Sequence, residues 1–259
     1  MTADLLSVKI AIVSEVASER ELVRQAATQV PFPTDVSEVE ITADALVMGK
    51  SLASEGFDVV FFDSRIPKPD RQTVLDMLRE APNRPLAILI GAAELKTRGV
   101  LTDGLDVDGT LAKPIDVKEA RDLIDRCVRA RLPKKVLIVD DSSTVRSVIR
   151  KVLQASRFKL EGEEAEDGAV AIRKVKEQRY DIVFLDCQMP VIDGFAAVAE
   201  FLRIHPDMKV VMITGTRDVR IEDRARASGA RDFLYKPFFA KDIDAVLNRL
   251  FGLMLPRWN

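Results

Sequence analysis

The chain has 259 residues, of which 47% are hydrophobic, and its formal net charge at pH 7 is −2. That length corresponds to two domains of ordinary size, with enough apolar material for a core in each. The balance of 39 basic and 41 acidic side chains argues against an extended nucleic-acid surface, which needs a clustered excess of Lys and Arg. The chain does not open with a charged segment leading into an apolar core, and no apolar run reaches membrane-spanning length. We therefore expect a cytoplasmic protein without a membrane partner.

The first half of the chain contains apolar runs of strand length. One extends from Val8 to Val13, and another, from Phe57 to Phe62, ends at Asp63. A Lys113-Pro114 pair lies further along the chain. Similar features recur in the second half, which indicates a duplicated domain rather than a short repeat.

A domain boundary is predicted near Pro133. The preceding segment, from Val117 to Arg131, has arginines at its end that suit a helix C-terminus, and the proline stops the helix. We predict two domains, over residues 5–131 and 134–255, which a short linker holds in contact. Each domain has one of the two cysteines, so we expect no disulfide.

In the second half, polar residues stand where apolar runs of strand length end. These residues are Asp140, Asp141, Asp186, Thr214 and Lys236. The runs that precede them are Val136 to Val139, Ile182 to Leu185, Val210 to Ile213 and Phe233 to Tyr235. Continuous apolar runs are typical of strands that are covered on both faces. If the strands are parallel, the five side chains converge at one edge of the sheet.

Stretches of helical length separate these runs. After Asp141, apolar residues recur at spacings of three and four, which places them on one helical face. The ranges with the same character are Ala169 to Val175, Phe195 to Ile204 and Ile243 to Leu250. Alternating strands and helices predict an α/β fold with a doubly wound parallel sheet. Such sheets bind ligands outside the carboxyl ends of their strands, where the five polar residues are expected.

Three carboxylates at this edge require a cation. Held close together, Asp140, Asp141 and Asp186 would raise one another's pKa values unless a positive charge intervened. Mg2+ fits best, because it needs one or two carboxylates and takes water and phosphate oxygens for the rest of its shell. Asp186 can then act as a nucleophile toward a phosphoryl group. Lys236 adds a positive charge, and Thr214 offers a hydroxyl to a phosphoryl oxygen.

Residues 134 to 252 resemble the CheY-like receiver domains of bacterial two-component response regulators. The motifs that carry the resemblance are Asp140-Asp141, Asp186-Cys187-Gln188-Met189-Pro190, Asp193-Gly194 and Lys236-Pro237. It implies a flavodoxin-like (βα)5 fold with a five-stranded parallel sheet and a cis Lys236-Pro237 bond. Asp186 is the expected phosphoacceptor, and Thr214 and Phe233 form the expected switch pair. The resemblance also implies a magnesium shell, made of Asp140, Asp141, Asp186 and the backbone carbonyl of Gln188.

The first half repeats this pattern with its site partly dismantled. Asp63 and Lys113 precede Asp186 and Lys236 by 123 residues (186 − 63 and 236 − 113). The departures from the second half are Ser14 and Glu15 in place of the acid pair, Ile90 in place of the threonine, and Thr110 in place of the switch aromatic. Isoleucine cannot donate a hydrogen bond to a phosphoryl oxygen. We predict a pseudo-receiver, in which an ion pair between Asp63 and Lys113 holds the fold without metal. The alternative is slow phosphorylation with weak metal binding.

The resemblance predicts a response regulator without a DNA-binding or enzymatic output domain. It would accept phosphate from a histidine kinase or a phosphotransfer protein and signal to a downstream protein, and the first domain could serve as a docking or dimer surface. Self-phosphorylation and self-hydrolysis are the only catalysis expected. The open alternatives within this class are the input half of a longer regulator, such as a cyclic-nucleotide synthase, and a phosphorelay intermediate or phosphate sink.

Two other classes fit the sequence less well. An aspartyl phosphatase of the haloacid dehalogenase class needs an acid two positions after the nucleophile, and Gln188 stands there. A flavin-binding flavodoxin needs a loop of backbone donors after the first strand. The segment Ser142-Ser143-Thr144 could supply them, but the neighbouring Asp140 and Asp141 would repel the phosphate.

Overall fold

The computed structural model describes residues 7–39, 44–92, 105–189 and 193–254. The chain divides into two compact units, Met1–Arg131 and Leu132–Asn259, called here the first and second domains. The outer limits predicted for the domains, residues 5 and 255, lie outside the described residues, as do Pro190 and the last four residues of the chain.

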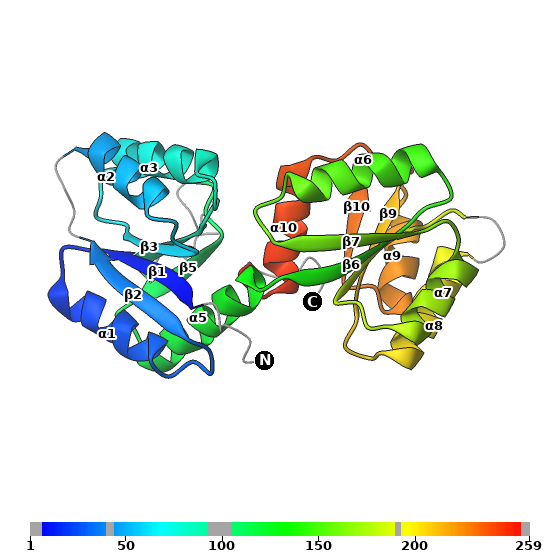
Figure 1. Ribbon diagram of the computed structural model, residues 1–259, viewed down its shortest axis with the longest axis horizontal. Helices are drawn as coiled ribbons and strands as arrows, with labels where there is room; N and C mark the ends of the chain where they lie inside the picture. Colours follow the sequence, from blue (N-terminus) through cyan, green and yellow to red (C-terminus); the bar gives the residue numbers. More distant parts are fainter. Residues whose placement is uncertain (1–6, 40–43, 93–104, 190–192, 255–259) are drawn as a thin grey trace, which may run out of the picture. The chain divides into compact units, whose positions relative to one another are not determined.

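Each domain alternates strands and helices (Figure 1). The first domain contains β1 (Val8–Val13), α1 (Ala17–Ala27), β2 (Thr34–Val39), α2 (Ala45–Ser54), β3 (Val59–Asp63), α3 (Lys68–Glu80), β4 (Leu86–Ala92), β5 (Gly109–Lys113) and α5 (Val117–Arg131). The second contains β6 (Lys134–Val139), α6 (Ser143–Gln154), β7 (Leu160–Ala165), α7 (Gly168–Glu177), β8 (Ile182–Asp186), α8 (Gly194–Ile204), β9 (Lys209–Thr214), α9 (Val219–Ser228), β10 (Asp232–Tyr235) and α10 (Ala240–Leu250).

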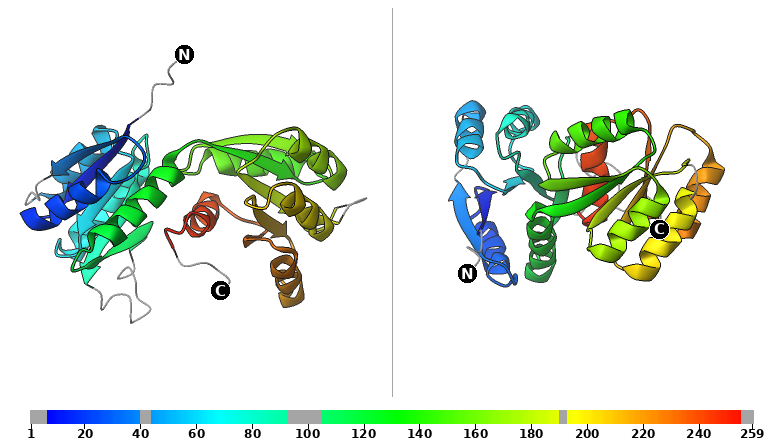
Figure 2. Two further views of the ribbon diagram at one scale, coloured as in Figure 1. Left: turned by 90° about the horizontal axis from the view of Figure 1, so that it is seen from below. Right: turned by 45° about the vertical axis from the view of Figure 1, so that its right-hand side comes forward.

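Both sheets have five parallel strands in equivalent orders. The first sheet has the order β2-β1-β3-β4-β5 and the second β7-β6-β8-β9-β10. In the second domain, α6 and α10 cover one face of the sheet and α7, α8 and α9 cover the other (Figures 1 and 2). The predicted α/β class and the doubly wound, flavodoxin-like sheet of five parallel strands are confirmed for both domains.

The central strands are continuous apolar runs because helices bury both of their faces. Successive side chains of a strand point to opposite faces. In β6, for example, Leu137 and Val139 join the core beneath α7 and α8, whereas Val136 and Ile138, also fully buried, point to the other face. Every residue of β8 is buried for the same reason.

The edge strands β2 and β7 have a different composition. Their sequences are Thr-Asp-Val-Ser-Glu-Val and Leu-Glu-Gly-Glu-Glu-Ala, and most of their side chains are partly or fully exposed. Each pairs with a single neighbour, β1 or β6. Much of the surface of these two strands is uncovered, so polar residues are tolerated there, and no apolar run marks them in the sequence.

The duplication extends to side-chain contacts on the corresponding elements. In the first domain, Arg20 pairs with Glu38 at 2.9 Å and donates to the carbonyl of Ser14. In the second, Arg146 pairs with Glu164 at 3.0 Å and donates to the carbonyl of Asp140. The same ion pair thus ties the first helix to the second strand in both domains.

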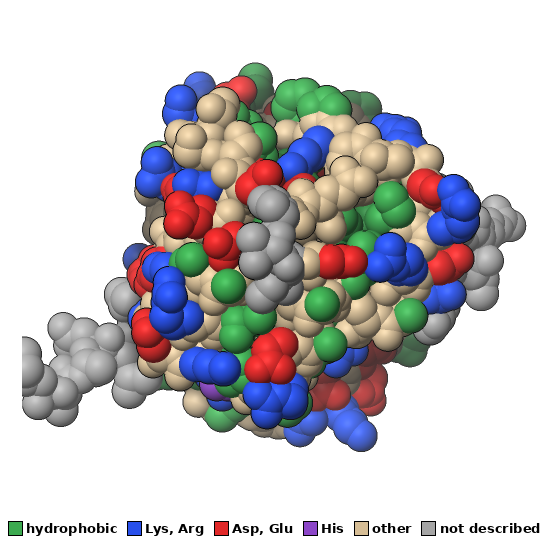
Figure 3. Space-filling model, turned by 90° about the vertical axis from the view of Figure 1, so that its right-hand side faces the viewer, with side chains coloured by type: hydrophobic (Ala, Val, Ile, Leu, Met, Phe, Trp, Pro, Cys, Tyr) green, Lys and Arg blue, Asp and Glu red, His purple; other side chains and the backbone are tan. Residues whose placement is uncertain are grey.

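Among the described residues, no helix combines the length and the apolar character that a membrane span requires. On the face of the second domain seen in Figure 3, basic and acidic side chains are interspersed with apolar ones. The described residues drawn there form no extended area of a single charge.

Candidate functional site

The polar residues singled out in the second domain lie at the carboxyl edge of its sheet. Asp186 and Thr214 are the last residues of β8 and β9, Asp140 directly follows β6, and Lys236 directly follows β10. Because all of these strands are parallel, their carboxyl ends meet at one edge.

Lys236 joins two of the carboxylates. Its ammonium nitrogen Nζ lies 2.7 Å from Oδ2 of Asp140 and 2.7 Å from Oδ1 of Asp186. Asp140 is only 2% exposed and Asp186 7%. Two nearly buried carboxylates therefore share one partly buried cation, and the net charge of the three groups is −1 when all are ionised.

Burial and the neighbouring opposite charges have opposite effects on the pKa values of Asp186 and Lys236. Burial raises the pKa of Asp186 above its usual range, and the nearby Asp140 raises it further, against the effect of Lys236. Burial lowers the pKa of Lys236, but its hydrogen bonds to Asp140 and Asp186 outweigh that effect and raise it overall. The ammonium therefore stays protonated at neutral pH, and it opposes the repulsion between the two carboxylates.

The backbone around Asp186 holds its carboxylate in place. The amide of Gln188 donates to Oδ2 of Asp186 at 3.0 Å. Asp193 caps α8 by accepting from the amide of Phe195 at 2.7 Å. At Gly194, an added Cβ would lie 2.4 Å from the backbone oxygen of Asp186, so only glycine lets α8 begin this close to the end of β8.

Asp141 stands apart from the other two carboxylates. It is exposed, whereas Asp140 and Asp186 are buried. Among the described residues, no group of three or more histidine, cysteine or carboxylate side chains is close enough to hold a metal ion. The expected cluster of three carboxylates is thus only partly assembled, with two members in place.

Two carboxylates nevertheless satisfy what Mg2+ requires from a protein. Oδ1 of Asp140 accepts from the amide of Ser142 and its Oδ2 accepts from Lys236, and an ionised carboxylate has about four acceptor positions in all. Each of the two carboxylates can therefore take a metal ion in addition to its present partners. The donor set of this edge fits a hard divalent cation.

The predicted switch pair lies next to this cluster. Thr214 is 1% exposed, and its Oγ1 accepts from the amide of Thr216 at 3.2 Å. The Phe233 ring is fully buried and meets the Tyr235 ring edge-on, with 5.2 Å between centroids. The ring therefore lies inside the domain, next to the strand ends that hold the acidic residues. The hydroxyl of Tyr235 in turn donates to Glu222 of α9, which links β10 to that helix.

Both Lys-Pro bonds that the sequence aligns, Lys113-Pro114 and Lys236-Pro237, are cis. The expected cis isomer of the second bond is thus confirmed.

The corresponding edge of the first domain contains the ion pair predicted there. Nζ of Lys113 lies 2.9 Å from both carboxylate oxygens of Asp63, which is completely buried. Ser14 is also buried and places its hydroxyl 3.1 Å from Oδ2 of Asp63. Glu15, at the position of Asp141, is exposed.

Two further residues of this edge were not anticipated from the sequence. Arg65 donates to Asp63 from its backbone amide at 2.9 Å and from its guanidinium Nη2 at 2.7 Å. The same Nη2 lies 2.8 and 2.7 Å from the two carboxylate oxygens of Glu19, on α1. A signal was present for Arg65, because it follows Asp63 by two positions, as Gln188 follows Asp186. Glu19 had a weaker signal, since it replaces an apolar residue of the second domain's first helix, Val145.

The residue predicted to replace Thr214 in the first domain, Ile90, was wrong by one position. The sheet registers pair Asp63 with Ile90 and Asp186 with Ile213, so Ile90 corresponds to Ile213 and fills a buried core position. Gly91 is the residue at the position of Thr214. The first domain thus lacks a side chain there altogether. Thr110 does correspond to Phe233, because they pair with Leu89 and Met212 at equivalent places.

Each domain also holds one free cysteine, and both thiols are buried. Burial raises the pKa of Cys187, next to Asp186, to about 12, and it raises the pKa of Cys127 as well. Neither thiol is ionised near neutral pH.

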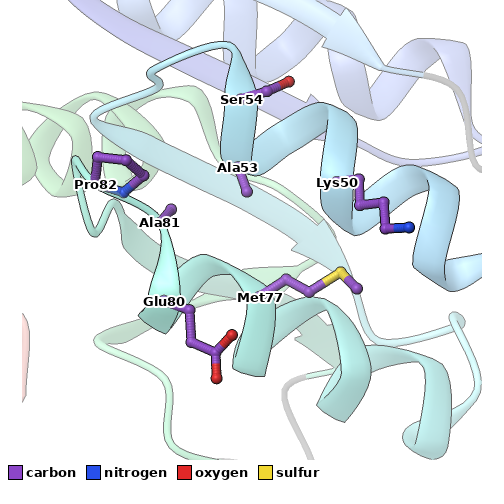
Figure 4. Close-up of a pocket in the computed structure, with 7 residues that line it drawn as sticks. All are labelled: Lys50, Ala53, Ser54, Met77, Glu80, Ala81 and Pro82. Atoms are coloured by element: carbon purple, nitrogen blue, oxygen red, sulfur yellow. The ribbon is translucent and has the colours of Figure 1, made fainter.

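A groove of about 510 Å3 lies in the first domain between α2 and α3 (Figure 4). The residues that line it are Lys50, Ala53, Ser54, Met77, Glu80, Ala81 and Pro82. They belong to the second half of α2, to the end of α3 and to the two residues that follow α3, whereas Asp63 and Lys113 end strands. The groove is therefore separate from the edge that holds the acidic residues.

Comparisons with known proteins agree with this geometry. Residues 136–248 match the response regulator receiver domain family. The chain is 37% identical over 118 residues to Protein CcdB of Bacillus subtilis, covering 46% of this chain and 98% of that protein. It is 32% identical over 117 residues to the chemotaxis protein CheY of Thermotoga maritima, covering 45% of this chain and 97% of CheY.

A solved structure extends the likeness of fold to both domains. It is described as a probable two-component system response regulator/GGDEF domain protein, and the alignment covers 95% of this chain and 98% of that one, with 22% identity and a TM-score of 0.52. The chain covers nearly all of two relatives at more than 30% identity, and its two sheets have equivalent strand orders. It therefore belongs to the response regulator receiver family and has two receiver-like domains in tandem.

Proposed function

We propose that this protein is a response regulator that accepts a phosphoryl group on Asp186 from a histidine kinase or a histidine phosphotransfer protein. The observation that supports this most directly is the placement of Lys236, 2.7 Å from both Asp140 and Asp186. An ammonium held between two buried carboxylates can stabilise negative charge that develops beside the nucleophile.

The transfer is a displacement at phosphorus. A carboxylate oxygen of Asp186 attacks the phosphorus of a phosphohistidine, the P–N bond breaks, and its electron pair stays with the imidazole nitrogen. The carboxylate becomes an acyl phosphate, and hydrolysis later restores it and releases inorganic phosphate. Asp140 and Asp186, with the Gln188 carbonyl, would hold Mg2+, which would neutralise charge on the phosphoryl oxygens.

The signal would leave the site through the neighbouring strands. The Thr214 hydroxyl, at the end of β9, accepts from the Thr216 amide and still has its own proton to donate to a phosphoryl oxygen. On β10, Phe233 and Tyr235 connect the site to α9 through Glu222. A changed surface at α9 would then be read by a downstream protein in the cytoplasm. Self-phosphorylation and self-hydrolysis are the only catalysis we assign, and phosphate storage or onward transfer is the alternative use of the same chemistry.

Labelling with a small-molecule donor tests the proposal. The wild-type chain, Asp186→Asn and Asp63→Asn are treated with radiolabelled acetyl phosphate and Mg2+, and the acid-stable label on each is counted. We expect label on wild type and on Asp63→Asn, and none on Asp186→Asn. Label that survives Asp186→Asn and disappears in Asp63→Asn would assign the chemistry to the other domain.

A second candidate is the receiver part of a longer regulator. The tandem fold aligns with nearly the whole of a solved chain described as a probable response regulator/GGDEF domain protein. That likeness concerns fold alone. An antibody raised against the second domain would distinguish the two, because a native polypeptide larger than 28.8 kDa supports the longer regulator and a band at that mass contradicts it.

A further inference from the structure

The charged side chains at the carboxyl edge of the first sheet, called here the acidic pocket of the first domain, comprise equal numbers of acidic and basic groups. Two carboxylates, Asp63 and Glu19, face two cations, Arg65 and Lys113. Lys113 contacts both carboxylates at 2.9 Å, and Arg65 contacts both at 2.7 Å. The pocket is thus neutral as it stands, whereas the pocket of the second domain carries an excess negative charge.

Three substitutions relative to the second domain produce this difference. Ser14 replaces Asp140 and removes the carboxylate at the end of the first strand. Glu19, on the first helix, returns a carboxylate from another direction. Arg65 occupies the position of Gln188, and its guanidinium lies between the two carboxylates.

The ligand set of the first pocket therefore does not fit a divalent cation. Oδ1 of Asp63 accepts from the amide of Arg65 and from Lys113, and its Oδ2 lies within hydrogen-bond distance of Ser14, Arg65 and Lys113. A metal ion would have to displace these donors and remain next to a guanidinium that cannot lose its proton. Mg2+ also demands near-ideal octahedral geometry, and the Asp63 oxygens that it would need already accept from Lys113 and Arg65.

We propose that Arg65 is a built-in replacement for the divalent cation, so that the acidic pocket of the first domain excludes metal and stays in one permanent state. The guanidinium supplies the positive charge that holds the two carboxylates together. Glu19 supplies the second of the carboxylates that the guanidinium contacts. The inference concerns the first domain only and does not depend on phosphorylation of Asp186.

Metal binding to the full chain tests this inference. The Asp140→Asn, Asp186→Asn double variant disables the second pocket, and Mn2+ binding to it is measured by electron paramagnetic resonance of the free ion. We expect the first pocket to bind no Mn2+. Adding Asp63→Asn to the double variant should therefore leave the Mn2+ binding curve unchanged. A loss of bound Mn2+ on adding Asp63→Asn would overturn the inference.

Reconstruction of the second pocket's donors provides the converse test. In the same background, Ser14→Asp with Arg65→Gln restores the residues found at Asp140 and Gln188, and we expect Mn2+ affinity to rise about tenfold or more. The matched control, Ser14→Asp with Arg65→Lys, keeps the positive charge and should not gain that affinity. A reconstructed variant that is folded by circular dichroism but gains no affinity would contradict the role of Arg65, as would equal gains in both variants. Neither measurement involves a phosphodonor, so its outcome is independent of whether Asp186 accepts phosphate.

Discussion

Single lysines at the two sheet edges perform different tasks. Lys236 is the one cation of the described residues that contacts both Asp140 and Asp186, so it alone opposes their repulsion. Lys113 shares its two carboxylates with Arg65. Loss of the lysine should therefore have a larger effect on the second site than on the first.

Lys236→Met should reduce the rate of acyl phosphate formation from acetyl phosphate by about 100-fold, the usual effect of removing one stabilising donor from a preorganised site. Lys174→Met is the matched control, because Lys174 forms a half-exposed ion pair with Glu163 away from the site. Its labelling rate should equal that of wild type. An equal rate for Lys236→Met would mean that the ammonium does not assist the transfer.

The acidic pocket of the first domain should make stability depend on pH. Burial raises the pKa of Asp63, but hydrogen bonds from Arg65 and Lys113 outweigh it and bring the pKa to about 2, from 3.8 in the unfolded chain. The folded state thus holds its proton less tightly, so this stabilisation is complete above about pH 4 and is lost as the pH falls toward 2. The shift corresponds to about 2 kcal/mol.

Urea unfolding of wild type and Asp63→Asn between pH 2 and pH 6 measures this contribution. The difference in free energy of unfolding should shrink as the pH is lowered. Asp186 has a raised pKa, so its ionisation costs stability as the pH rises, and Asp186→Asn should show the opposite trend. The same trend in both variants would contradict the assigned shifts.

At the level of elements, the start of α8 depends on one close approach. Gly194→Ala would place a methyl group 2.4 Å from the backbone oxygen of Asp186, and backbone cannot move aside as a flexible side chain can. We expect a loss of about 1–3 kcal/mol in the free energy of unfolding, together with slower phosphorylation.

Gly162→Ala on the edge strand β7 provides the comparison. Its Cβ would meet only Ile138, at an ordinary 3.6 Å, so stability should change little. Chemical denaturation and acetyl phosphate labelling of both variants check the prediction. Equal stability of the two variants would show that α8 can shift away from β8 at little cost.

The elements also show what the sequence could reveal. Central strands such as β8 were predictable, because burial on both faces leaves a continuous apolar run. The edge strands β2 and β7 were not, since their composition is mostly polar. Lys236 and Asp186 could be placed together from strand ends alone. The contact between Glu19 and Arg65 could not, because it depends on side-chain directions from a helix and a loop that are 46 residues apart.

At the scale of the whole molecule, duplication has produced two domains with the same sheet order and different charges at the carboxyl edge. The fold and the Arg20–Glu38 type of ion pair recur in both. The acidic pockets differ in charge, because the first is neutral and the second carries excess negative charge. Divalent metal should therefore act on one half of the chain and leave the other unaffected.

Calorimetry can check that expectation. Addition of Mg2+ should raise the unfolding temperature of one transition and leave the second unchanged, because a ligand stabilises only the unit that binds it. Chelation should reverse the shift. In the Asp140→Asn variant, the transition that Mg2+ shifts in wild type should no longer respond to Mg2+. A shift of both transitions in wild type would contradict the expectation that metal acts on one domain only.

The two buried thiols give the intact chain a reporter in each half. Cys127 and Cys187 are the only cysteines, and both are protonated and shielded in the folded state, so alkylating reagents can reach them only when the surrounding structure opens. Mass spectrometry of peptides from the iodoacetamide-treated protein would then follow each opening reaction separately. Beryllofluoride with Mg2+ should slow modification of Cys187 and leave that of Cys127 unaltered.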